Sequence, residues 1–281
     1  MAQNYQSVAR RKENISAIEP LISAMRTISL SQWRMALNRQ AGLDTFLQEL
    51  ESASANLKNE KGLSYAQPEE NQDILIVLGS NRGLCGNFNK HLVQYAKNEH
   101  LHEKKLSQVF LVGKQLPALF KRFQDWPMSE IAFPEIAAVQ HAFSIFALDS
   151  LDKLDGKSVT VLYNRYQGAG QYETINHQIY PIQPQERSDS RLEQVGVILD
   201  TEARSLLRTL QYLTFSAHLQ TCLYASLASE HSARFALMET ADQNIENLIT
   251  ELEMQLQDYR KGKITAETQE LAVSSGLLKA K

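Results

Sequence analysis

The longest stretch of the chain without a helix breaker runs from Val197 to Lys261 and contains neither glycine nor proline. These two residues most often end a helix, so the stretch predicts one long helix, on the order of 100 Å at 1.5 Å per residue. Positions spaced alternately three and four residues apart along this stretch are mostly apolar, and they include Leu213, Leu227 and Leu252. This spacing, near 3.5 residues, is typical of a coiled coil.

The N-terminal segment repeats the pattern, with Ile15, Ile18, Met25, Phe46 and Leu50 on one seam. Pro20 lies inside it, so the sequence predicts that the helix either begins or kinks there. Each segment has one narrow apolar stripe. The simplest way to bury both stripes is an antiparallel two-helix coiled coil.

The pattern of apolar residues changes in the middle of the chain. Apolar runs at Asp73–Gly79 and Ser107–Gly113 are each followed by a helical pattern, which indicates parallel strands with helices on the faces of the sheet. Two later strands around "QGAG" read as a hairpin, so the sheet is expected to be mixed. The predicted fold is therefore α/β: a small central Rossmann-like domain at 72–182, between coiled-coil helices at 1–62 and 197–278.

The turn in "ILIVLGSNRGLCGNFNK" (Ile74–Lys90) resembles a phosphate-binding or catalytic loop at first sight. The lysine and hydroxyl residue of a phosphate loop are missing after Gly83, and the dinucleotide fingerprint is incomplete. Cys85 has no histidine tied to it by a motif. We therefore expect Gly83, Cys85 and Gly86 to form a structural strand-to-helix turn, with no catalytic residue, cofactor or metal.

The remaining composition excludes several classes of function. The formal net charge of −3 argues against nucleic-acid binding through bulk charge. Two cysteines, Cys85 and Cys222, give no disulfide framework or metal cluster. Glu230 and His231 are adjacent, which is not metal-ligand spacing, and are expected to be solvated or to face an interface. No secretory signal is visible, and no apolar run approaches the ~18 residues of a membrane span.

Several segments, in the right order, resemble the gamma subunit of F-type ATP synthases. They are "LISAMRTISLSQWRMA", "GSNRGLCGNFNK", "LYASLASEHSARFALMETADQN" and "DYRKGKITAETQEL". The third of these is the most specific. The predicted layout of two terminal helices around a small α/β domain is also that of the family.

This resemblance implies a non-catalytic rotor stalk that couples ion flow through the membrane c-ring to ATP synthesis or hydrolysis by rotation. The implied partners are the alpha and beta subunits of the F1 hexamer, the epsilon subunit and the c-ring. The implied location is peripheral, on the cytoplasmic face of the cell (inner) membrane. The resemblance also places Arg260 and Thr265 opposite an acidic loop of a catalytic subunit. Met25 and Arg26 would lie close to the same level, and Lys261 would add positive charge there.

The chain also departs from the family pattern. Pro20 stands in a segment that is usually richer in lysine, and the residues after Ile264 differ from the usual ending. These differences allow a diverged paralogue from an alternative F-type ATPase. Two other functions remain open from the sequence: a small α/β enzyme with a coiled-coil arm, and a coiled-coil adaptor without a rotary role.

Overall fold

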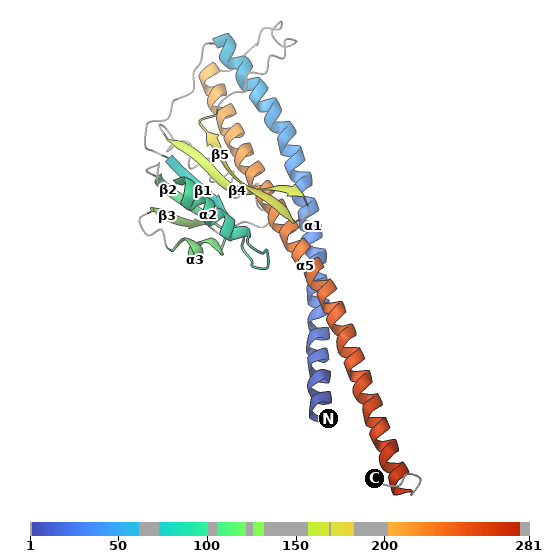
Figure 1. The fold of residues 1–281 in the computed structure, drawn as a ribbon. Coiled ribbons are helices and arrows are strands. Elements are labelled where there is room, and N and C mark those ends of the chain that lie inside the picture. The colour runs from blue at the N-terminus through green and yellow to red at the C-terminus, as the bar shows by residue number, and fades with distance from the viewer. Residues whose placement is uncertain are drawn as a thin grey trace. The chain divides into compact units, whose positions relative to one another are not determined.

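The computed structural model describes residues 2–61, 73–100, 106–121, 126–131, 157–168, 170–182 and 202–275. The chain forms two compact units. We call Met1–Ile28 with Phe235–Lys281 the helical unit, and Ser29–Arg234 the sheet unit. Two long helices, α1 (Ala2–Lys61) and α5 (Ala203–Ser274), contribute residues to both units (Figure 1).

Helix α1 begins at Ala2 and continues through Pro20, which is exposed. Of the two alternatives that the sequence left open, a helix start at Pro20 is therefore wrong. A proline inside a helix removes one backbone hydrogen bond, but flanking turns can hold the helix when the ring faces solvent.

In the helical unit the two helices are antiparallel, as three side-chain contacts show. Tyr5 contacts Arg260, Lys12 pairs with Glu253, and Arg26 pairs with Asp242, so residue numbers rise on one helix as they fall on the other. Met238 and Leu252 of α5 are almost fully buried. The expected antiparallel pairing of the terminal helices is confirmed here.

The sheet unit contains one five-stranded sheet in the order β3-β2-β1-β4-β5. The strands are β1 (Asp73–Leu78), β2 (Leu106–Val112), β3 (Met128–Ile131), β4 (Ser158–Gly168) and β5 (Gln171–Tyr180). The first four pair in parallel, whereas β4 and β5 form an antiparallel hairpin. The predicted mixed sheet is confirmed, and β3 is a strand that the sequence did not reveal.

The two faces of the sheet bury two separate apolar clusters, because side chains alternate along each strand. Ile74, Ile76 and Leu78 of β1 pack with residues of α5 between Phe215 and Ala228 and with Ala36 of α1. Leu75 and Val77 pack on the opposite face, against α2 (Phe88–His100) and α3 (Leu116–Phe120). The sheet therefore lies between α5 and the two short helices (Figure 1).

Small polar residues of α5 bond directly to the sheet. The Ser226 hydroxyl donates to the Leu78 carbonyl at 3.3 Å. The Ser232 hydroxyl accepts the Gly170 N–H at 2.9 Å and donates to the Gly168 carbonyl at 3.4 Å, at the end of the β4–β5 hairpin. Small side chains let the α5 backbone approach the strands closely, and their hydroxyl groups occupy backbone groups of the sheet.

The N-terminal seam predicted from the sequence is not correct at every position. Phe46 is 42% exposed, and its neighbour Leu47 is buried with Leu50 against Ala217 of α5. Ile18 is also exposed. An α-helix with 3.6 residues per turn drifts away from a strict 3.5-residue repeat, so the buried stripe moves by one residue along α1.

Candidate functional site

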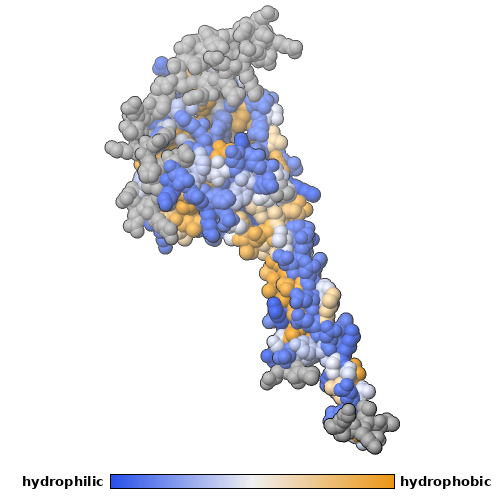
Figure 2. All heavy atoms as spheres, viewed as in Figure 1, coloured by the Kyte–Doolittle hydropathy of each residue, from blue (hydrophilic) through white to orange (hydrophobic). Residues whose placement is uncertain are grey.

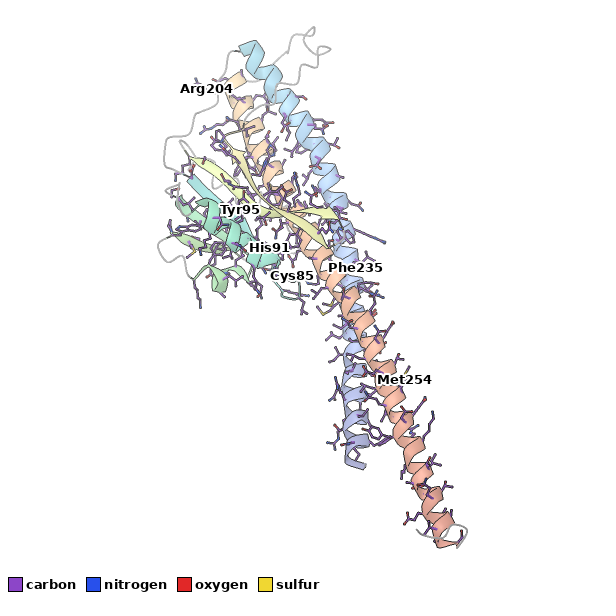
Figure 3. The ribbon with its side chains drawn as sticks, viewed as in Figure 1. Cys85, His91, Tyr95, Arg204, Phe235 and Met254 are labelled. Atoms are coloured by element: carbon purple, nitrogen blue, oxygen red, sulfur yellow. The ribbon has the colours of Figure 1, made fainter. Side chains whose placement is uncertain are left out.

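The first candidate site is the turn that joins β1 to α2, residues 79–87. Cys85 lies in this connection, and His91 and Tyr95 follow on α2 (Figure 3). Cys85 is buried in the same apolar cluster as Phe88 and Leu92. Arg82, Gly83, Leu84 and Gly86 are exposed around it. The turn therefore has a buried cysteine and an exposed, mostly backbone outer surface.

The conformation of this turn depends on close packing at Gly79 and on left-handed backbone further along. A Cβ atom at Gly79 would lie 2.4 Å from Leu116 Cγ, so only glycine lets the end of β1 pack on α3. Leu84 and Gly86 have φ values of 60° and 63°. Left-handed φ is uncommon for leucine and marks a constrained turn.

Hydrogen bonds within the protein occupy the backbone N–H groups at the start of the turn. Asn89 Oδ1 accepts the Ser80 N–H at 3.0 Å, and its Nδ2 donates to Ser80 Oγ at 2.8 Å. The Gly79 N–H donates to the Val112 carbonyl at 2.8 Å, and the Ser80 carbonyl accepts the Gln115 N–H at 3.1 Å. A phosphate-binding loop instead points several backbone N–H groups at its ligand.

Arg234 of α5 holds the outer part of the turn. Its Nε and Nη2 donate to the Gly83 carbonyl, both at 3.3 Å, and Nη2 also donates to the Arg82 carbonyl. Nη2 lies 2.6 Å from Glu230 Oε1, and both side chains are more than nine-tenths buried. This buried ion pair connects α5 to a turn that is more than 140 residues earlier in the sequence.

The electrostatics of this cluster follow from its burial. Burial raises the pKa of the Glu230 carboxyl, and the Arg234 charge opposes that rise. Burial, together with the charges of Arg234 and Arg82, lowers the pKa of His231 to about 4. His231 is therefore neutral near pH 7, and its Nδ1 lies 3.2 Å from Arg234 Nη1 as an acceptor. The prediction that Glu230 is solvated or faces an interface is wrong, because Arg234 makes its burial possible.

Cys85 does not have the surroundings of an activated thiol. Burial raises the pKa of the Cys85 thiol, whereas a nucleophilic cysteine needs a lowered one. Its Sγ lies 3.6 Å from Ser80 Oγ and 3.9 Å from the Arg82 carbonyl. No group of three or more metal-ligating side chains occurs among the described residues.

The second candidate site is the set of residues on the helical unit: Met25, Arg26, Arg260, Lys261 and Thr265. Arg26 Nη1 lies 3.1 Å from Glu239 and 3.0 Å from Asp242, so its charge is paired within the unit. Asp242 and Arg260 are eighteen positions apart on α5, which is about 27 Å of helix at 1.5 Å per residue. The expectation that Met25 and Arg26 lie at the level of Arg260 is therefore wrong, because antiparallel pairing sets Tyr5 beside Arg260 instead.

Arg260, Lys261 and Thr265 lie on α5, near the end of the region in which α5 pairs with α1. Arg260 Nη2 and Nε donate to the Tyr5 hydroxyl at 3.1 and 3.3 Å, and the guanidinium carbon lies 5.9 Å from the ring centroid. Lys261 is exposed, and its carbonyl accepts the Thr265 hydroxyl at 2.9 Å. From Arg260 to Ser274 every residue of α5 except Ala272 is exposed.

The surface of the helical unit mixes charged residues with isolated large apolar ones (Figure 2). Met254, labelled in Figure 3, is 60% exposed, and Ile264 and Leu271 are exposed to a similar extent. Apolar side chains scattered singly over a surface are normal and by themselves identify no binding surface. None of the described helices has an apolar segment long enough to cross a membrane.

These features define a class of protein: one in which a pair of long antiparallel helices carries a mixed α/β domain. The sequence model of the family described as ATP synthase matches residues 4–276, and the chain belongs to this family. It is 24% identical to the ATP synthase gamma chain of Clostridium beijerinckii, with 94% of both chains covered. It is 25% identical to that of Rickettsia bellii, with 97% of this chain and 98% of the relative covered.

Solved structures have the same fold. One is a chain of the Euglena gracilis mitochondrial ATP synthase described as OSCP/F1/c-ring in rotational state 3, with a TM-score of 0.67 and 17% identity. The match covers 100% of this chain and 98% of that one. A chain of the central stalk and c-ring of the Tetrahymena thermophila enzyme has a TM-score of 0.59 and 18% identity, covering 79% of this chain and 99% of that one.

Proposed function

We propose that the protein is the central rotor stalk, or gamma subunit, of an F-type ATP synthase. The observation that carries this proposal is the family match over residues 4–276, with gamma chains covered over almost their whole length. In this role the subunit couples ion flow through the membrane c-ring to ATP synthesis or hydrolysis by rotating within the hexamer of alpha and beta subunits. A rotor must resist bending and twisting, and two paired helices with few glycines have the required stiffness.

The proposed partners are the alpha and beta subunits, the epsilon subunit and the c-ring. Similarity to chains from solved rotor and F1/c-ring assemblies supports the F1 hexamer and the c-ring as partners, and the family resemblance adds the epsilon subunit. The subunit itself is proposed to be non-catalytic and peripheral, on the cytoplasmic face of the cell (inner) membrane. The hydrogen bonds that occupy the turn after β1 support the absence of a nucleotide site there.

Arg260, Lys261 and Thr265 are proposed to contact a catalytic subunit. The exposure of Arg260 and Lys261 at the end of the paired helices supports this role, since a guanidinium and an ammonium group both attract carboxylates. Met25 and Arg26 form a separate proposed contact level. There, the pairing of Arg26 with Glu239 and Asp242 fixes the position of its side chain.

Affinity purification of the tagged full-length chain from its own membranes tests the assignment. We expect the alpha, beta, epsilon and c subunits to co-purify, together with ATPase activity that the isolated chain lacks. Recovery of the chain with other proteins and without alpha and beta would favour the adaptor. Micromolar ATP affinity in a calorimetric titration of the purified chain would favour the small enzyme and would contradict the rotor proposal.

A further inference from the structure

The side chain of Tyr5 is the partner that the structure gives to Arg260. Tyr5 lies in the first turns of α1, and Arg260 lies near the last paired turn of α5. Two N–H groups on one edge of the guanidinium, Nε and Nη2, point at the phenolic oxygen at 3.3 and 3.1 Å. The guanidinium carbon also lies 5.9 Å from the ring centroid, within the range of a cation–π contact.

This partner holds the arginine without neutralising it. Elsewhere in the helical unit, Lys12 and Arg26 are paired with carboxylates. A phenolic oxygen is a neutral acceptor, so this contact does not neutralise the positive charge of Arg260. The hydroxyl group accepts from Arg260 and still has its own proton to donate. The pair therefore offers N–H and O–H donors at one place, which suits a carboxylate.

We propose that Tyr5 is a positioning residue for Arg260, and that the pair forms one donor site for a carboxylate of a neighbouring subunit. This inference rests on the proposed rotor function, because it deepens the role of Arg260 there. An arginine side chain free in solution must lose its rotamer freedom when it binds. Tyr5 restricts that freedom beforehand, and ordering one such side chain corresponds to roughly a 2- to 10-fold change in binding.

The test compares the wild-type subunit in the assembled complex with three variants: Tyr5→Phe, Arg260→Ala and the double variant. Phenylalanine keeps the ring and removes only the hydroxyl group. Tyr259→Phe is the matched control, because it removes a phenolic hydroxyl one residue from Arg260 that makes no described contact with the guanidinium. ATP hydrolysis and ATP-driven ion pumping are measured together on vesicles whose subunit content is checked.

We expect Arg260→Ala to change the hydrolysis rate or the ratio of pumping to hydrolysis. Tyr5→Phe should change the same quantity in the same direction by about 2- to 10-fold, whereas Tyr259→Phe should leave it unchanged. In the Arg260→Ala background, Tyr5→Phe should add less than about twofold, because its effect passes through the arginine. A purely structural role for Tyr5 would lower thermal stability without moving the ratio.

The outcomes separate the two proposals. No effect of Arg260→Ala would remove the coupling role of Arg260 itself. The positioning role alone would be overturned if Arg260→Ala has an effect and Tyr5→Phe has none. It would also be overturned if Tyr5→Phe has the same effect in the wild-type and Arg260→Ala backgrounds. If a variant does not assemble, NMR of the Arg260 Nε–H in the full-length chain decides. Tyr5→Phe should speed its exchange with water, and unchanged exchange would overturn the inference.

Discussion

Replacing Arg234 with methionine should destabilise the sheet unit more than most single substitutions. The change removes the charge that faces Glu230 and leaves that carboxylate buried without its partner. Breaking a buried ion pair from one side costs about 3–5 kcal/mol. The bonds to the Arg82 and Gly83 carbonyls are lost as well, and because both residues are exposed, solvent should replace part of that loss.

Tryptophan fluorescence during urea unfolding of the full-length chain measures this effect. The chain has two tryptophans, and Trp33 and Trp126 both lie in the sheet unit, so the signal reports on that unit. With a slope of roughly 2 kcal/mol per molar urea, the transition should move down by about 2 M. The deficit should shrink as the pH is lowered, because burial raises the pKa of Glu230 and its carboxyl becomes neutral on protonation.

A second variant shows whether the charge or the hydrogen bonds to the turn cause the loss. Replacing Glu230 with leucine in the Arg234→Met background leaves no buried charge, so most of the stability should return. If the double variant is as unstable as the single one, the bonds from Arg234 to the turn carry the stability. A shift of less than about 0.5 M for Arg234→Met would refute the argument altogether.

Three further substitutions test other parts of the structure. Burial and the neighbouring His177 lower the pKa of His218 to about 4, although Glu51 Oε1 lies 3.5 Å from its Nε2 and favours the charged form. The unfolded chain therefore takes up this proton first, and up to roughly 3 kcal/mol of stability should be lost as the pH falls from 6.5 to 4; His218→Gln should flatten that dependence in urea titrations. Leu248→Pro should cost about 3 kcal/mol or more of α5 stability, visible as lost helicity by circular dichroism and as impaired assembly. Gly79→Ala should cost about 1–3 kcal/mol by calorimetry, since its Cβ would overlap Leu116, and an unchanged melting temperature would contradict the packing.

The sequence predicted the parts of this fold that depend on periodicity. The apolar stripe of α5 and the buried runs of β1 and β2 are regular enough to read directly. Strand β3 was missed because "MSEI" is four residues long and only partly buried. The shift from Phe46 to Leu47 was missed because a sequence pattern does not include the slow drift of a helix against its partner.

The candidate sites were harder to predict because their contacts join distant parts of the chain. The sequence did contain one signal: His231 and Arg234 stand at positions of the α5 seam where apolar residues are expected. Their spacing from Glu230 also suits contacts within one helix, but nothing in the sequence identifies the Gly83 carbonyl as a partner. In the same way, the pairing of Tyr5 with Arg260 follows from the antiparallel register, which periodicity alone does not fix.

The hydrogen bonds of two serines between α5 and the sheet affect how strongly α5 resists rotation about its own axis. An apolar stripe would hold a helix against a sheet but would resist its rotation about its own axis only weakly, since neighbouring apolar residues can replace one another. Ser226 bonds to Leu78, and Ser232 bonds to Gly168 and Gly170. Hydrogen bonds are directional, so a turn of α5 by even one residue would break all three. Within the sheet unit, these three bonds should therefore transmit torque on α5 to the strands.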